Sequence, residues 1–364
     1  MEPLAPGTPR KGRGAVSNAT GRYETEQRHA VDDGWGTAWA IDPDLGAPSL
    51  RTTLTKDTAR TVITRNASPD VPFDRSINPY RGCEHGCIYC FARPTHAFLG
   101  LSPGLDFESR LFYKPDAADL LAEELRHPRY ECRVIAMGTN TDPYQPVERR
   151  LQITRRILEV LAAHRHPVGI VTKSTLVLRD LDILAPMAKD GLAHVCVSVT
   201  TLDPALARRM EPRAPTPERR VETIRALAAA GVPATVMAAP VIPVLTDHEL
   251  ETILETAARA GATSAGYVLL RLPLEIKDLF REWLAAHAPA KARHVMALIH
   301  DVRGGRDNDP RFGSRMRGEG AYAELIARRF RLAAERLGLG QRRYALDTSK
   351  FRVPPRAGDQ LSLF

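Results

Sequence analysis

The stretch from Asn78 to Phe91, NPYRGCEHGCIYCF, decides how the rest of this 364-residue sequence is interpreted. Its three cysteines, Cys83, Cys87 and Cys90, follow the spacing C-x3-C-x2-C, and no fourth cysteine lies close to them in the sequence. Thiolates are typical ligands of iron–sulfur clusters. Because three thiolates hold three corners of a cubane cluster, the spacing predicts a [4Fe-4S] centre whose fourth iron is open to a ligand.

The same residues leave two alternatives. His85 lies between the cysteines and could complete a zinc site, because structural zinc takes four nitrogen or sulfur ligands. Zinc sites usually combine two ligand pairs across a long spacer, and the sequence has no second C-x2-C or H-x3-H pair. Disulfides are disfavoured because the chain has five cysteines and no secretory signal precedes them.

Composition indicates a protein with one sizeable core. The hydrophobic fraction is 43%, and no run approaches the roughly 18 apolar residues of a membrane-spanning helix. Residues 1–20 are polar and lack the apolar segment of a signal peptide, so we expect a cytoplasmic protein without a membrane partner. The net charge is +8, and the segment 315–356 holds 11 Lys and Arg against 4 Asp and Glu. This basic region predicts a polyanionic partner, although a solvated helix face explains it equally well.

Strands and helices alternate along the middle of the chain. Beyond the segment that leads into the cysteines, apolar and β-branched runs predict strands at 133–137, 168–172, 193–199, 234–239 and 265–270. Apolar residues at helical spacing predict helices at 116–127, 147–164, 176–189, 216–230 and 247–260. Six such repeats imply a parallel sheet that curls into an open barrel, with active groups at the C-terminal ends of the strands. Further helices are expected at about 275–302 and 321–337.

The cysteine spacing resembles the signature of the radical S-adenosylmethionine (SAM) superfamily. Over roughly residues 55 to 275, further stretches are similar to its spore-photoproduct-lyase-like branch. These stretches are Asn78–Cys83, Thr141–Pro146, Glu211–Pro215 and Pro240–Pro243. The resemblance implies an α/β fold, a partial (β/α)6 barrel of the open TIM type. It also implies a [4Fe-4S] cluster and SAM as cofactors, with SAM chelated by the open iron and cleaved to methionine and a 5'-deoxyadenosyl radical.

The resemblance assigns several residues to SAM. Tyr89 stands where the superfamily has an aromatic residue near the adenine, and Pro240 with Val241 is expected to border the same ring. The SAM carboxylate needs a cation and a hydroxyl. Lys173 and Ser198, at the ends of the next strands, are expected to supply them.

The loop after the strand 133–137 is dense in polar groups. By the resemblance, Gly138, Asn140, Thr141 and Asp142 receive the amino group and ribose of SAM. Thr139 stands where spore photoproduct lyases have a hydrogen-donating cysteine. The chain therefore lacks the hydrogen donor that those lyases use, so the resemblance does not extend to their own reaction. The superfamily signature is unchanged.

Cys196 is a candidate for the hydrogen donor instead. Strand alternation places it on the same face as Ser198, which should point into the barrel. Free cysteine is also a common small buried residue, so packing alone is the competing interpretation.

We expect four regions: an irregular N-terminal arm (1–54), the barrel (55–275), a helical extension (276–346) and a tail (347–364). The chain ends in QLSLF, which resembles the bacterial sliding-clamp-binding motif at every position. A Pro- and Gly-rich linker precedes this pentapeptide. The predicted clamp-binding residues are Gln360, Leu361, Leu363 and Phe364. Packing of these residues back onto the barrel is the alternative.

These features predict a radical SAM enzyme, lyase-like in its chemistry, with nucleic acid as the favoured substrate and DNA repair or modification as the context. The resemblance also implies a flavodoxin or ferredoxin as electron donor. One alternative keeps the chemistry and exchanges the substrate for a peptide or small metabolite. The other is a non-enzymatic iron–sulfur redox sensor or nucleic-acid-binding module.

Overall fold

The computed structural model describes residues 9–25, 50–339 and 345–355. Its centre is a seven-stranded sheet in the order β10-β9-β8-β7-β6-β3-β2. The strands are β2 Ile63–Arg65, β3 Arg75–Ile77, β6 Ile135–Met137, β7 Val168–Thr172, β8 Ala193–Ser198, β9 Ala234–Val241 and β10 Ser264–Leu269. Six strands of this sheet run parallel, namely β3, β6, β7, β8, β9 and β10, and β2 pairs with β3 in the antiparallel direction.

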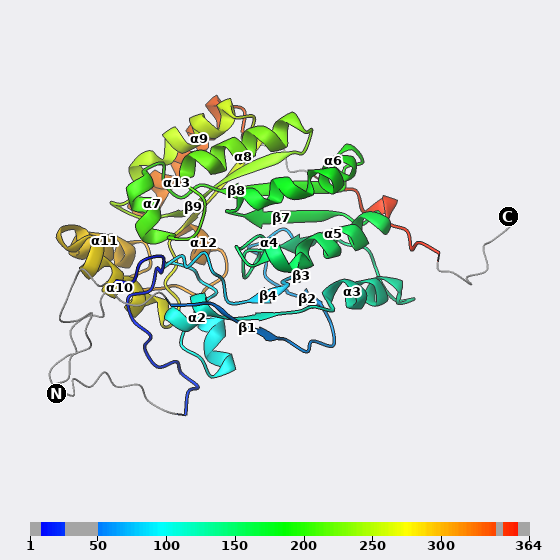
Figure 1. Cartoon of the computed structure of the whole chain (residues 1–364). Helices are drawn as coiled ribbons and strands as arrows, with labels where there is room; N and C mark the ends of the chain where they lie inside the picture. The colour runs from blue at the N-terminus through cyan, green and yellow to red at the C-terminus, as the bar shows by residue number, and fades with distance from the viewer. Residues whose placement is uncertain (1–8, 26–49, 340–344, 356–364) are drawn as a thin grey trace.

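Helices follow the parallel strands and cover one face of the sheet (Figure 1). The main ones are α3 Ala117–Arg126, α5 Ile153–Ala163, α6 Leu181–Lys189, α8 Pro217–Ala229 and α9 Leu250–Arg259. They pack side by side, α3 on α5, α5 on α6 and α8 on α9. Their apolar faces meet strand residues in the larger hydrophobic core. Six parallel strands with their helices confirm the predicted partial (β/α)6 barrel.

The inner face of the strands carries different residues. Along β8, Val195 and Val197 are fully buried in the larger core, whereas His194, Cys196 and Ser198 alternate with them and point to the opposite face. Because the six strands run in one direction, their C-terminal ends meet at one edge. Groups that follow the strands therefore come together there.

One predicted helix is interrupted by a buried carboxylate. The predicted helix 147–164 consists of α4 Glu148–Leu151 and α5, separated by Gln152 with a left-handed φ of 52°. The Glu148 carboxylate accepts a hydrogen bond from the backbone amide of Thr154. It therefore satisfies an amide at the start of α5 that lacks a partner within that helix.

A small second sheet consists of β1 Thr53–Lys56, β5 Arg110–Tyr113 and β4 Tyr80–Arg81, in that order. It lies beside the cysteine loop, as we call residues 78–91. β1 runs parallel to β5, and β4 runs antiparallel to it. Strands this short carry little periodic signal, so the sequence does not predict this sheet. The short elements are β1 Thr53–Lys56, β4 Tyr80–Arg81, η1 Arg93–Leu99, α2 Leu105–Ser109, β5 Arg110–Tyr113, η2 Thr175–Asp180, α7 Pro204–Met210, η3 Asp247–Glu249 and η4 Thr348–Lys350.

The C-terminal helices are α10 Ile276–His287, α11 Pro289–Asp301, α12 Ser314–Arg317 and α13 Ala321–Arg336. The helix predicted for 275–302 is two helices, because Pro289 opens α11 and cannot continue α10. In Figure 1, α10 and α11 lie on the same side of the molecule as residues 9–25. Trp283 and Phe280 of α10 share a second core with Ile88 and Tyr89 of the cysteine loop. Within the described ranges, no helix is long and apolar enough to cross a bilayer.

Candidate metal centre and its supports

The three cysteines directly follow the short strand β4, in the connection that leaves β3 at the C-terminal edge of the large sheet. Cys83 and Cys87 are buried, and Cys90 is partly buried. The loop turns tightly, since the amide of Gly86 donates to the carbonyl of Cys83 and the amide of Cys90 donates to that of Cys87. Burial, followed by nearby charges that include the other two cysteines, raises the pKa of Cys83. The three sulfurs therefore lie close enough to act on one another.

Burial raises the pKa of all three thiols above the ordinary value. The Lys173 ammonium opposes this effect by lowering the pKa of Cys87 and Cys90. Thiols that burial keeps protonated lose their protons when a metal supplies positive charge. Three adjacent thiols beside a cation therefore fit an iron–sulfur cluster with three protein ligands.

His85 is engaged elsewhere and does not complete a zinc site. Its Nδ1 lies 3.3 Å from Oδ2 of Asp142, and its side chain is 2% exposed. Across residues 9–25, 50–339 and 345–355, no three His, Cys, Asp or Glu side chains converge on one metal ion. A cluster differs, because each of its thiolates binds a separate iron. The geometry disfavours the zinc alternative.

A second loop, which follows β6, is hydrogen-bonded along the cysteine loop. Thr141 donates its hydroxyl to the carbonyl of Tyr80 at 2.9 Å. The side-chain amide of Gln145 donates to the carbonyl of Gly82 at 3.2 Å and accepts from the amide of Glu84 at 2.9 Å. The two loops are therefore locked in register, and cysteine positions depend on both.

Asp142 is the centre of that second loop. Its Oδ1 accepts hydrogen bonds from the Tyr144 amide and the Thr172 hydroxyl. Its Oδ2 accepts the Lys173 amide at 2.8 Å and faces His85. Burial alone would raise the pKa of Asp142, but His85 and these hydrogen bonds lower it to about 2. The carboxylate therefore stays ionised and orders the ends of β6 and β7.

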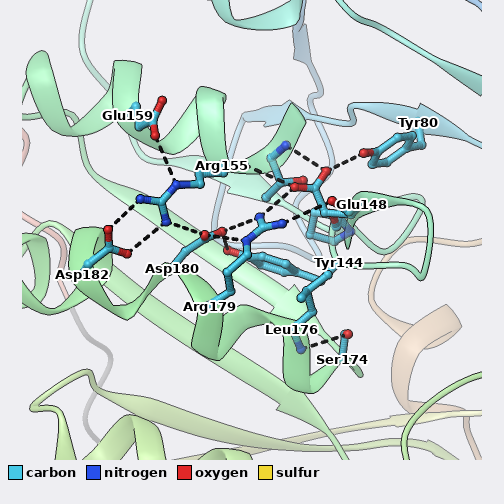
Figure 2. A network of polar contacts seen from close by, with 12 residues as sticks. Tyr80, Tyr144, Glu148, Arg155, Glu159, Ser174, Leu176, Arg179, Asp180 and Asp182 are labelled. Carbon is cyan, nitrogen blue, oxygen red and sulfur yellow. Dashed lines mark hydrogen bonds and ion pairs between the residues drawn. The ribbon is translucent and has the colours of Figure 1, made fainter. Parts of the chain in front are cut away.

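Two completely buried carboxylates, Glu148 and Asp180, lie beneath the loops (Figure 2). Glu148 accepts from the hydroxyl of Tyr80, and Asp180 accepts from the hydroxyl of Tyr144 at 3.0 Å. Arg179 donates to both carboxylates. Burial and the adjacent carboxylates raise the pKa of both tyrosines, so they remain hydrogen-bond donors. This network fixes the cysteine loop, through Tyr80, to the second loop, through Tyr144.

The segment after α7 supports the cysteine loop from the other side. The Glu211 carboxylate, 1% exposed, accepts hydrogen bonds from the Tyr89 hydroxyl and the Arg220 guanidinium. Arg213 forms an ion pair with Glu84 at 3.0 Å. In the sequence, this segment has no predicted role beyond its part in the resemblance. A Glu and an Arg flanked by prolines were the only signal in the sequence.

A further buried ion pair lies under the loop. Arg93 contacts Glu108, and neither side chain has exposed area. Arg93 also donates to the carbonyls of Gly86 and Cys87, at 3.0 and 2.9 Å. Glu108 accepts the amide of Gly14 at 2.9 Å, and a Cβ on Gly14 would lie 1.9 Å from the carbonyl oxygen of Gly86. Part of the N-terminal arm, predicted to be irregular, therefore packs directly on the cysteine loop.

The backbone also approaches closely where β6 ends. Gly138 has a φ of +82°, and a Cβ there would lie 1.9 Å from the carbonyl oxygen of Val171 in β7. Glycine is thus required for this turn. The amide of Asn140 then donates to the side chain of Asn78 at 3.1 Å, which again joins the second loop to the cysteine loop.

Residues 77–257 match the family model described as the radical SAM superfamily, and this span contains all three cysteines. The chain belongs to the radical SAM superfamily. Membership implies a [4Fe-4S] cluster and SAM as cofactors, as predicted, and it makes the protein an enzyme. The zinc alternative and the non-enzymatic sensor are therefore set aside.

Relatives of this radical SAM protein are found in bacteria and archaea. An uncharacterized protein of Mycobacterium tuberculosis is 43% identical over 227 residues, which cover 62% of this chain and 67% of that protein. An uncharacterized protein of Methanocaldococcus jannaschii is 30% identical over 173 residues, which cover 48% of this chain and 62% of that protein.

Solved structures of spore photoproduct lyase share the fold. One variant of that lyase superposes with a TM-score of 0.57 at 16% identity, over 86% of each chain. The lyase complexed with dinucleoside spore photoproduct gives 0.55 at 16% identity, over 78% of this chain and 79% of that one. A further lyase variant has bound SAM and gives a TM-score of 0.54 at 15% identity, over 78% of this chain and 79% of that chain.

The residues predicted for SAM lie at the same strand edge as the cysteines. Lys173 directly follows β7, Ser198 ends β8, and Pro240 with Val241 ends β9. The ammonium of Lys173 lies 5.7 Å from the centroid of the Tyr89 ring. The fold thus brings these residues to one edge, and their contacts with SAM stay predictions.

Cys196 lies inside the barrel of this radical SAM protein. Its Sγ is 3.8 Å from Nδ1 of His194, whose Nε2 is 2.7 Å from the hydroxyl of Thr235. Burial raises the pKa of Cys196 to about 12 and lowers that of His194 to about 4. Both groups are therefore uncharged at neutral pH, and Cys196 keeps its S–H bond.

Part of the basic C-terminal region is already paired. Arg329 forms an ion pair with Glu251, and Arg336 forms one with Glu255, so both arginines attach α13 to α9. The charge available to a polyanion is correspondingly smaller than the sequence count implies. The predicted clamp-binding residues lie outside the described part of the chain: Gln360, Leu361, Leu363 and Phe364.

Proposed function

We propose that this radical SAM enzyme acts on nucleic acid, with DNA preferred over RNA. The observation that carries the proposal is the fold shared with spore photoproduct lyase complexed with dinucleoside spore photoproduct. The net charge of +8 and the sequence pI of about 9.4 are in keeping with a polyanionic substrate. A peptide or small metabolite is the alternative substrate class.

The chain's own residues bind and orient SAM in this proposal. When bound, the cluster supplies the electron that cleaves SAM to methionine and a 5'-deoxyadenosyl radical. We assign the SAM carboxylate to Lys173 and Ser198, because a charge-assisted hydrogen bond suits an anion. We assign the adenine to Tyr89, Pro240 and Val241. The loop after β6 carries the residues assigned to the amino group and ribose: Gly138, Asn140, Thr141 and Asp142.

Cys196 is the proposed hydrogen donor to a substrate radical. In this step the S–H bond breaks homolytically, the hydrogen atom forms a C–H bond with the substrate radical, and the unpaired electron is left on the Cys196 sulfur. A thiol with a pKa of about 12 retains the hydrogen that the step needs. Cys196 shares the interior face of β8 with Ser198, two residues further along the strand, and this supports a position near the SAM carboxylate that we assign to Ser198.

The proposal is tested by assaying anaerobically reconstituted, reduced protein with deuterated DNA, RNA and protein extracts. We expect 5'-deoxyadenosine formation, stimulation by DNA, and deuterium transfer from DNA into 5'-deoxyadenosine. Transfer from the protein extract alone would replace nucleic acid by a peptide substrate. Loss of DNA-derived product in Cys196→Ala, with deuterium transfer into 5'-deoxyadenosine retained, would support the hydrogen-donor assignment.

Three further assignments remain proposals. The electron donor is a flavodoxin or ferredoxin, the location is the cytoplasm, and the C-terminal QLSLF peptide binds a bacterial sliding clamp. The clamp proposal is tested by titrating purified clamp with full-length protein and with protein lacking the last five residues. Equal binding by both proteins would contradict it.

A further inference from the structure

We propose that Phe91, Arg271, Phe312 and Arg315 form a stacking platform that binds an unpaired nucleotide strand beside the cluster. This inference rests on the proposed nucleic-acid function and names the part of the surface that would carry it. It requires nucleotides that are single-stranded or extruded from a duplex, because stacked and paired bases offer no free ring face.

Phe91 supplies the first ring. It directly follows Cys90, and 49% of its surface is exposed, although most of the cysteine loop is buried. The guanidinium of Arg271 lies 5.8 Å from its ring centroid. An exposed aromatic face with an adjacent arginine is the arrangement that stacks nucleobases in proteins that bind single strands.

Arg271 is the cation of the platform with few hydrogen-bond partners among the described residues. It follows β10 and is partly buried, and its Nε has no hydrogen-bond partner among the described residues. Its Nη1 contacts the sulfur of Met316 at 3.7 Å, a weak acceptor. Within the described chain, no carboxylate lies at ion-pair distance from it. A guanidinium held in this way is ready to donate to a phosphate or a base edge.

The second half of the platform lies in the loop that carries α12. Phe312 is 59% exposed, and the guanidinium of Arg315 lies 4.5 Å from its ring centroid. Arg271 contacts Met316, the residue that directly follows Arg315 in α12. The two ring-and-arginine pairs are therefore neighbours on one surface.

The platform is rigid because its loop is anchored twice. The buried Arg303 donates to the carbonyls of Leu269 and Leu270 at the end of β10, and to those of Ser314 and Arg315. On the other side, Arg315 forms an ion pair with Asp70. Asp70 neutralises Arg315 in part and leaves Arg271 as the stronger site for an anion.

Charge and aromatic surface together select the partner. A polyanion without rings would use the arginines alone, whereas an apolar peptide would use the rings alone. A nucleotide strand uses both, since each base has a ring face and each phosphate a negative charge. The position of Phe91 next to Cys90 would bring a stacked base to the edge where the radical forms.

The test measures binding of fluorescein-labelled dT12, of U12 and of the dT12–dA12 duplex to the full-length, cluster-loaded protein, at several salt concentrations. The variants are Phe91→Leu and Phe312→Leu, which keep apolar bulk but remove the ring, and Arg271→Gln. Arg219→Gln on α8, exposed and paired with Glu222 on its own helix, is the matched control. Iron content is measured for every variant. Polyglutamate serves as a competitor that has charge but no rings.

We expect the parent protein to bind dT12 or U12 more tightly than the duplex. Each Phe→Leu change should weaken binding by about five- to a hundredfold without changing the salt slope. Arg271→Gln should reduce that slope by roughly one. If Phe91→Leu loses iron, Phe312→Leu alone decides, because its loop contains no cysteine.

Four results would overturn the platform: variants that bind as tightly as Arg219→Gln, unaltered slopes in Arg271→Gln, preference for the duplex, or displacement by polyglutamate as effective as by dT12. A parent protein that binds no oligonucleotide at low salt would contradict the proposed nucleic-acid function itself. The four results that overturn the platform leave the proposed nucleic-acid function intact. Failure of the platform can therefore be distinguished from failure of that function.

Discussion

Arg93 and Glu108 form an ion pair from which solvent is fully excluded, and this pair joins the cysteine loop to the N-terminal arm. The arginine holds carbonyls of the cysteine loop, while the carboxylate holds amides of the arm. Neither partner is a ligand or a reacting group. The position of the cysteines nevertheless depends on them.

Glu108→Gln should destabilise the protein by about 3–5 kcal/mol, because it leaves the buried Arg93 charge without its partner. Chemical denaturation under anaerobic conditions measures the change in the free energy of unfolding. Glu218→Gln, at an exposed position of α8, is the control and should fall within about 0.5 kcal/mol of the parent. Equal stability of the two variants would contradict the structural role of the pair.

Alanine at Cys83, Cys87 or Cys90 should abolish assembly of a complete cluster. The parent protein should bind about four irons per chain after anaerobic reconstitution. Cys132→Ala removes a partly buried cysteine outside the loop and should retain the parent iron content. Tightly bound zinc without iron uptake in the parent protein would contradict the assignment.

Lys173→Ala should weaken SAM binding by about 1.5–3 kcal/mol, the contribution of a hydrogen bond to a charged group. The cluster should still assemble, because Lys173 is not a ligand. Equilibrium dialysis with labelled SAM measures the dissociation constant. Lys189→Ala, exposed at the end of α6, should bind SAM like the parent, and parent-like binding by Lys173→Ala would remove Lys173 from the SAM site.

Stability should fall as the pH decreases from about 6.5 to about 4. Burial lowers the pKa of His96, His166 and His194 to about 4, whereas an unfolded histidine titrates near 6.5. In that window the unfolded chain binds protons that the folded chain does not, so each histidine costs roughly 1 kcal/mol per pH unit.

Thermal unfolding at several pH values measures this effect. His166→Gln should give a smaller pH slope than the parent, because one of the buried histidines no longer titrates. His294→Gln, exposed on α11, should leave the slope unchanged. A parent protein whose stability is constant between pH 4 and 6.5 would show that these histidines are accessible to protons in the folded state.

Gly14→Ala should loosen the arm from the cysteine loop, since its Cβ would overlap the carbonyl oxygen of Gly86. We expect the iron–sulfur absorbance to fade several-fold faster in air, at a cost to stability of roughly 1–3 kcal/mol. Gly169→Ala has no neighbour within 4 Å of the added Cβ and is the matched control. Identical fading of both variants would show that the arm does not shield the cluster.

Much of the fold is predictable because it depends on repeated local patterns. The strand 168–172 is predicted at its observed bounds, because β-branched residues between polar turns favour a strand over a helix. The cysteines and Lys173 are also predictable, because a fixed spacing and a place at a strand end both lie in the sequence. The break in the predicted helix 147–164 was not predictable, since the buried Glu148 carboxylate accepts the amide of Thr154 just beyond Gln152.

The supports of the site could not be predicted for a different reason. Arg13, Gly14 and Ala15 look like loop material in the sequence, yet all three are buried. Their burial arises from Glu108, more than ninety residues away in the chain. Glu211 likewise acquires its role from Tyr89 and Arg220. Local pattern carries no information about such distant pairs.

The contact between Glu211 and Tyr89 spans 122 residues, and α10 completes the core under the same loop. During synthesis the three cysteines therefore emerge from the ribosome long before Glu211 and α10, which hold the cysteine loop in place. Synthesis proceeds from the N-terminus at about 5–20 residues per second. Until α10 emerges, the core under the cysteine loop is incomplete, and the thiols are exposed to oxidation. Insertion of the cluster is consequently expected as a late step in maturation, and chains truncated before α10 should fail to acquire iron.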